Sequence, residues 1–176
     1  MFSKKQYRLV DDSFWDVAPV LLSGQASLPV SSQVAFAHLA DTNSWSTWYP
    51  TLNRAEWTSP APFGEGSTRV IQLRGKAQAE QQVTAWEEGF RIVFCFTSGR
   101  EPGMAAGAEE FWLRPTSPTS CELSWRMAVD VAGFAKIIPK ISGFILKVHP
   151  ASNALQRQVP RAFAKHLAKL ARPAGS

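Results

Sequence analysis

Polar and hydrophobic residues alternate along the middle of the chain, which predicts a run of β-strands. The alternation is clearest over 120–131, where Cys121, Leu123 and Trp125 share one face and Glu122 lies on the other. Similar segments, separated by Gly- and Pro-containing turns, lie at 53–58, 67–74, 77–87, 90–98 and 106–114. The pattern predicts antiparallel strands with one face toward water.

The residues before this region predict one more strand and one or two short helices. Residues 17–30 suit a first strand, which Pro19 would confine to a sheet edge at its start. Ser31 or Ser32 can cap a helix that ends near Asp41. The residues that follow concentrate aromatic side chains ahead of a proline, which suits a short helix or a turn.

The end of the chain has a helical period. From Ser152 a hydrophobic stripe recurs every three or four residues, and basic residues occupy the remaining surface. This predicts an amphipathic helix of about six turns with a kink at Pro160. The stretch 134–148 is also apolar at helical spacing, with Pro139 and Gly143 inside it.

These elements predict an α+β fold in which a curved antiparallel sheet of six to seven strands wraps around the long C-terminal helix. The hydrophobic face of such a sheet must be covered, and the C-terminal helix is the large apolar surface left to cover it. One helix, roughly 10 Å across, cannot fill the concave face of a twisted sheet. Either bulky side chains fill the remaining space or a cavity is left.

Composition favours one globular domain. The 176 residues are 45% hydrophobic and 19% charged, and no hydrophobic run approaches the roughly 20 residues that span a bilayer. We expect an N-terminal arm over 1–16, loosely attached, one domain over 17–172 and a tail over 173–176. Cys95 and Cys121 suit core thiols, and the first residues lack the pattern of a secretory signal, so we expect a cytoplasmic protein.

Charge is distributed unevenly. Residues 1–130 carry 11 basic and 14 acidic side chains, whereas 131–176 carry 8 basic and none acidic. A solvated basic helix on a more acidic body explains this asymmetry, and an anionic membrane surface is the alternative, with 134–148 as an amphipathic gate. We expect no nucleic-acid partner, because the aromatic face of the sheet is needed to receive the terminal helix.

The order and spacing of several motifs resemble the polyketide cyclase/dehydrase-like branch of the SRPBCC superfamily, the START-like or helix-grip proteins. The resemblance covers about residues 24–171, and the motifs are the helix ending at Asp41, the Trp45/Trp48/Pro50 cluster, the Gly64-Glu65-Gly66 turn, the Val83–Glu87 strand and the Leu123-Ser124-Trp125 strand. It implies a hydrophobic cavity between sheet and helix, and it implies no single activity, since fold does not determine function. The arm and the apolar 132–150 segment depart from the family pattern.

No strong catalytic motif is present. The chain has no Walker-type loop, no GxSxG, no HExxH and no CxxC, so we expect neither a metal nor another cofactor. The histidines His38, His149 and His166 are far apart in sequence, and packed or surface positions are expected for them.

Three polar residues are candidates for proton transfer. Glu109 shares a strand face with Phe111 and Leu113, so it faces the cavity if they do, and a rim position is the alternative. Arg69 either shares an inward face with Ile71 or points outward. An inward Arg69 opposite Glu109 could orient a carbonyl or carboxylate. Tyr49 belongs to the aromatic cluster expected at the mouth of the cavity.

The favoured function is binding of a hydrophobic small molecule such as a lipid or polyketide. We expect the protein to be a monomer or a homodimer. An aromatase/cyclase or dehydratase enzyme and a membrane- or protein-interaction module are the alternatives. Candidate ligand-binding residues are Trp45, Trp48, Tyr49, Phe94, Phe96, Phe111, Trp125, Met127, Ile141, Leu155, Val159 and Phe163.

Overall fold

A computed structural model describes residues 4–74, 77–100, 104–131 and 150–171. The strands are β1 (Lys5–Gln6), β2 (Val20–Leu28), β3 (Leu52–Trp57), β4 (Thr68–Leu73), β5 (Gln78–Glu87), β6 (Arg91–Gly99), β7 (Met104–Ser117) and β8 (Ser120–Val131). The helices are α1 (Phe14–Val17), α2 (Ser32–Ala40), α3 (Thr42–Trp48) and α6 (Pro150–Leu170).

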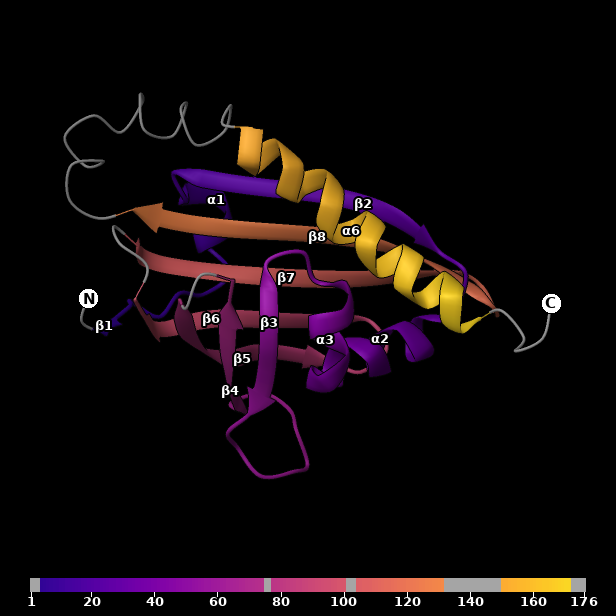
Figure 1. Ribbon diagram of the computed structural model, residues 1–176, viewed down its shortest axis with the longest axis horizontal. Coiled ribbons are helices and arrows are strands. Elements are labelled where there is room, and N and C mark those ends of the chain that lie inside the picture. The colour runs from indigo at the N-terminus through magenta and orange to yellow at the C-terminus, as the bar shows by residue number, and fades with distance from the viewer. Residues whose placement is uncertain (1–3, 75–76, 101–103, 132–149, 172–176) are drawn as a thin grey trace.

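The strands form one antiparallel sheet in the order β2-β8-β7-β6-β5-β4-β3, and β1 pairs with β6. Helix α6 crosses one face of this sheet, and α2 and α3 lie on the same side near its C-terminal end (Figure 1). The expected α+β helix-grip fold is therefore confirmed. The sheet has eight strands where six to seven were expected, because the N-terminal arm supplies the two-residue β1.

The alternating pattern builds the face that α6 covers, which we call the concave face. In β8 the side chains of Cys121, Leu123 and Trp125 are at most 1% exposed. The neighbouring β7 places Phe111 and Leu113 on the same face, paired in register with Trp125 and Leu123. Cross-strand packing of these side chains makes the core between sheet and helix.

The N-terminal arm was expected to be loosely attached, and the face of the sheet opposite α6, the convex face, was expected to contact water. Both expectations are wrong where the arm packs on this face. Phe14 and Trp15 are buried against Val93, Ala106 and other small apolar side chains on the convex face. The side chains that point outward here from β6, β7 and β8 are small and apolar, so the two aromatic rings can pack directly against the sheet. Burial of two large aromatic side chains supplies the energy that holds the arm.

Two polar residues define the short helices. The Ser31 hydroxyl accepts a hydrogen bond from the backbone N–H of Val34 and caps α2. Asp41 ends α2, and its carboxylate caps α3 by accepting from the N–H of Asn43. Because one residue ends one helix and begins the next, the aromatic residues of α3 are brought directly over the sheet.

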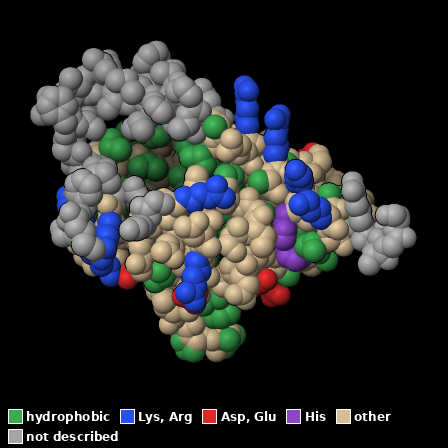
Figure 2. All heavy atoms as spheres, in the orientation of Figure 1, with side chains coloured by type: hydrophobic (Ala, Val, Ile, Leu, Met, Phe, Trp, Pro, Cys, Tyr) green, Lys and Arg blue, Asp and Glu red, His purple; other side chains and the backbone are tan. Residues whose placement is uncertain are grey.

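Helix α6 is held by its apolar stripe. Val159, Phe163 and Leu167 are fully buried, and the helix packs against β2 and β8. Basic side chains point outward along the helix (Figure 2). The helix continues through Pro160, and it approaches β2 closely at Gly24. The apolar stretch 134–148 lies outside the described residues.

Candidate functional site

Aromatic rings fill much of the space between the sheet and α6. The Trp45 ring lies 5.6 Å from that of Phe94 and 5.5 Å from that of Phe111, and Trp48 lies 4.6 Å from Phe163, measured between centroids. Such edge-to-face and tilted contacts are typical of packed aromatic cores. The cluster borders a cavity, because Trp45 also lines it.

The cavity has a volume of about 190 Å³. Hydrophobic side chains show in a hollow on the face that carries α6, near the start of the helix (Figure 2). The lining residues are Trp45, Tyr49, Thr51, Leu52, Arg69, Ile71, Leu73, Phe96, Met104, Glu109, Met127, Val129 and Leu155.

The candidate ligand-binding residues divide into two groups. Trp45, Tyr49, Phe96, Met127 and Leu155 line the cavity. The second group lies in the surrounding core, outside the lining, and consists of Trp48, Phe94, Phe111, Trp125, Val159 and Phe163. Ile141 falls outside the described residues. Their roles in binding stay predictions.

Glu109 is a buried carboxyl group held by two donors. It is 2% exposed, and its Oε1 accepts a hydrogen bond of 2.7 Å from the Tyr49 hydroxyl and another of 2.7 Å from the Trp125 indole N–H. Tyr49 comes from the end of α3 and Trp125 from β8, so the fold gathers the three residues from separate elements. Glu109 faces the cavity and does not lie at a rim.

Arg69 faces the same cavity from β4. It is 1% exposed, and its Nε donates a hydrogen bond of 2.8 Å to the Oε1 of Gln81, which lies directly opposite on β5. The guanidinium carbon lies 3.3 Å from the centroid of Phe94 and 4.0 Å from that of Trp45. Among the described residues, its two terminal nitrogens, Nη1 and Nη2, have no hydrogen-bond partner.

Burial changes the protonation of all three polar groups. It raises the pKa of Glu109, although the hydrogen bonds from Tyr49 and Trp125 and the charge of Arg69 oppose this shift. Burial also raises the pKa of Tyr49. It lowers the pKa of Arg69 to about 9, although the nearby Glu109 and Tyr49 act to raise the pKa of Arg69. Burial in this low-dielectric site therefore shifts both groups toward their neutral forms, and with a pKa of about 9 Arg69 still carries its charge near neutral pH.

Sequence reasoning missed Gln81, the polar residue that holds Arg69. Gln81 is fully buried and fixes the Nε of Arg69. The signal available was a run of glutamines in a predicted strand, but the inward positions there depend on a bulge between Glu80 and Gln81 that shifts the register with β6. Six residues of the cavity lining were missed as well, the polar Thr51 and the apolar Leu52, Ile71, Leu73, Met104 and Val129.

Two of the three histidines meet away from the cavity, and His149 lies outside the described residues. His38 on α2 and His166 on α6 stand edge to face with ring centroids 5.3 Å apart, and the Thr47 hydroxyl lies 3.4 Å from His166 Nδ1. Figure 2 shows histidine side chains at the surface near the end of α6. In the described part of the chain, no three His, Cys, Asp or Glu side chains come together to hold a metal ion.

Acid is expected to destabilise the contact between α6 and α2. The pKa of His166 is lowered by burial first and then by the charges of His38 and Lys169, against an opposing effect of Asp41. The unfolded state therefore binds a proton more readily, so this stabilisation is complete above the unfolded-state pKa of about 6.5 and is lost as the pH falls below it. Thermal unfolding between pH 8 and pH 5 should show a smaller acid-induced loss in His166→Asn than in the unchanged protein. Equal losses would contradict the prediction.

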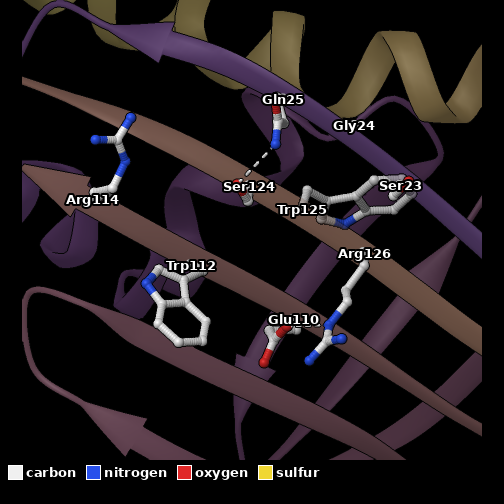
Figure 3. A pocket seen from close by; sticks show the side chains of 9 residues that line it. All are labelled: Ser23, Gly24, Gln25, Glu110, Trp112, Arg114, Ser124, Trp125 and Arg126. Carbon is white, nitrogen blue, oxygen red and sulfur yellow. Dashed lines mark hydrogen bonds and ion pairs between the residues drawn. The ribbon is translucent and has the colours of Figure 1, made fainter. Parts of the chain in front are cut away.

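A second hollow, of about 640 Å³, lies on the sheet face opposite Glu109. Figure 3 shows its lining, which includes Glu110, Trp112 and Arg126. Glu110 accepts hydrogen bonds from Arg91 Nε at 2.7 Å and from Arg126, so its charge is matched within the protein. This hollow is wide and its buried charge is satisfied, so we place the candidate site in the smaller apolar cavity.

The curled antiparallel sheet, the long helix across it and the apolar cavity between them define a helix-grip protein of the START-like class. The family model described as polyketide cyclase / dehydrase and lipid transport matches residues 20–175. The chain belongs to this family, which confirms the resemblance seen in the sequence.

Similar proteins support the same classification. An uncharacterized protein of Mycobacterium tuberculosis is 33% identical over 124 residues, which cover 70% of this chain and 74% of that protein. The aromatase/cyclase ZhuI from Streptomyces sp. R1128 has a similar structure with a TM-score of 0.63 at 13% identity, over 89% of this chain and 98% of that one. A START superfamily protein from Mycobacterium smegmatis has a TM-score of 0.56 at 17% identity, and the match covers 80% of this chain and 97% of that one. At these identities the two structures show the fold alone.

None of the helices in the described ranges is both long and apolar enough to cross a bilayer. Contact of 134–148 with an anionic membrane, the absence of a nucleic-acid partner and the choice between monomer and homodimer stay predictions.

Proposed function

We propose that the protein binds a small hydrophobic molecule, of the lipid or polyketide kind, in the cavity between the sheet and α6. The observation that carries the proposal is a cavity of about 190 Å³ with a mainly apolar lining. An engineered apolar cavity of about 150 Å³ stays dry and binds benzene, so a space of this size and lining favours an apolar guest over water. The family of the chain, which includes lipid transport in its description, supports the same function.

Filling the cavity is expected to abolish binding. Leu155 lines the cavity from α6, so Leu155→Trp places a large ring in the space that the ligand would occupy. Displacement of an apolar fluorescent probe should show at least a tenfold loss of affinity in this variant. Leu170→Trp is the matched control, since Leu170 lies on the same helix and is 56% exposed. Failure of the unchanged protein to take up any apolar probe, or equal binding by both variants, would contradict the proposal.

An enzyme of the aromatase/cyclase or dehydratase type is a second candidate. One observation favours it: Arg69, Glu109 and Tyr49 line one cavity, and two of them are hydrogen-bonded to each other. A carboxyl with a raised pKa is suited to moving protons near neutral pH. Conversion of a short poly-β-ketone by the protein, lost in Glu109→Gln, would favour this candidate over binding alone.

We also propose a cytoplasmic location. Cys95 and Cys121 are both buried free thiols, which is usual for proteins of reducing compartments.

A further inference from the structure

Arg69 is a buried cation with unused donors. Its side chain is 1% exposed, and the Nη1 and Nη2 atoms have no hydrogen-bond partner in the part of the chain that the structure describes. Buried charged groups are costly unless they are paired, and most buried donors in proteins find an acceptor. An arginine in this position therefore indicates an acceptor that the described residues do not supply, such as a group of a bound ligand.

The nearby carboxyl group does not supply that acceptor. Both hydrogen bonds to Glu109 end on Oε1 and come from Tyr49 and Trp125, and neither terminal nitrogen of Arg69 reaches it. Arg69 and Glu109 nevertheless line the same cavity. Arg69, whose buried Nη1 and Nη2 atoms have no partner among the described residues, thus lines the cavity together with Glu109, whose pKa is raised by burial.

The guanidinium group is held in a fixed orientation. Gln81 accepts from Nε, and the rings of Phe94 and Trp45 lie 3.3 and 4.0 Å from the guanidinium carbon. With Nε occupied, the edge formed by Nη1 and Nη2 is left for a ligand. Two parallel N–H donors on this edge match the two oxygens of a carboxylate.

We propose that Arg69 is the receptor for a carboxylate group, and that the ligand is a small apolar acid whose hydrocarbon part fills the cavity. This inference rests on the proposed function and narrows the class of ligand. The volume of about 190 Å³ holds a guest of about eight non-hydrogen atoms, by scaling from benzene in about 150 Å³. A benzoate-sized aromatic acid or a short alkyl acid meets both conditions.

Protonation of Glu109 assists this binding. A second anion in the cavity disfavours ionisation of Glu109, so the ligand binds best when that carboxyl is neutral. The groups that face Glu109 are Tyr49 and Trp125, which donate to it, and the charged Arg69. Affinity for the acid should therefore fall as the pH rises through the pKa of Glu109, and Glu109→Gln should bind the acid with a flatter pH profile.

Three probes of similar size test the inference: benzoate, its neutral isostere benzamide, and toluene. We expect calorimetry or NMR titration to show benzoate binding at least tenfold more tightly than benzamide. Arg69→Met should lose this preference for benzoate while it keeps toluene binding. Arg69→Lys should show a weaker preference, because lysine lacks the two parallel N–H donors of the guanidinium group. Arg114→Met is the control, since Arg114 is an exposed arginine paired with Glu122 on the convex face.

The outcomes separate the inference from the proposed function. If neither toluene nor benzoate binds, the proposed function and the carboxylate inference are both wrong. If toluene binds and benzoate binds no more tightly than benzamide, or if Arg69→Met keeps the benzoate preference, the carboxylate receptor is wrong and the hydrophobic site stands. Tighter binding of phenyl phosphate than of benzoate would also overturn the carboxylate assignment. Should Arg69→Met fail to fold, the comparison of benzoate with benzamide on the unchanged protein decides.

Discussion

Trp45→Ala is expected to lower the free energy of unfolding by about 3–5 kcal/mol, the usual cost of removing a large aromatic side chain from a core. Trp45 is fully buried, and its ring meets those of Tyr49, Phe94 and Phe111. Its indole N–H also donates a hydrogen bond of 2.9 Å to the backbone carbonyl of Leu39. The substitution leaves a void in the aromatic cluster and an unpaired carbonyl. Urea denaturation at neutral pH measures the loss.

Trp112→Ala is the matched control for this experiment. Trp112 is 48% exposed on the convex face, where removal of a side chain usually changes stability by less than about 0.5 kcal/mol. A loss below about 1 kcal/mol in Trp45→Ala, or equal losses in the two variants, would contradict the placement of Trp45 at the centre of the core.

Gly24→Ala is expected to destabilise the protein by about 2–3 kcal/mol, at the upper part of the range for overpacking. A Cβ added at Gly24 would lie 2.1 Å from the backbone oxygen of Gln156 and 2.9 Å from the ring of Pro160. The first contact is with helix backbone, which cannot move aside as a flexible side chain can. The variant must shift α6 away from β2. Differential scanning calorimetry should show a clearly lowered Tm.

Pro160 explains why this contact is so close. Proline lacks the N–H that would bond to the carbonyl four residues earlier, and its ring pushes against that carbonyl. The carbonyl is that of Gln156, the group that approaches Gly24. Gly64→Ala is the control, because a Cβ at Gly64 meets no atom within 4 Å. An unchanged Tm in Gly24→Ala would show that α6 is free to adjust at this point.

The sequence predicted the fold where one pattern dominated. The strict alternation over 120–131 and the stripe from Leu155 to Leu170 each allow one arrangement, and the sheet and helix follow from them. The arm was predicted wrongly because the convex face was expected to contact water. Val93 and Ala108 on that face are small and apolar, and they are buried under the arm. Alternation reports on one strand, whereas the covering of that face depends on a segment far away in sequence.

The site was less predictable for a related reason. Arg69 and Glu109 each sit in a strand where both faces have apolar residues, so their direction could not be decided locally. Only the pairing of β4 through β8 puts both on the concave face. The meeting of His38 with His166, 128 positions apart, likewise depends on the docking of α6, which no local pattern reports.

The arm that covers the convex face has an effect on the other side of the sheet. Ala108 packs under Phe14 and Trp15, and the next residue along β7 is Glu109. The strand that carries this carboxyl is therefore shielded from solvent on its convex side as well as on the side of the cavity. The first residues of the chain, remote from the cavity, thus cover the opposite side of the strand that positions the carboxyl group inside it.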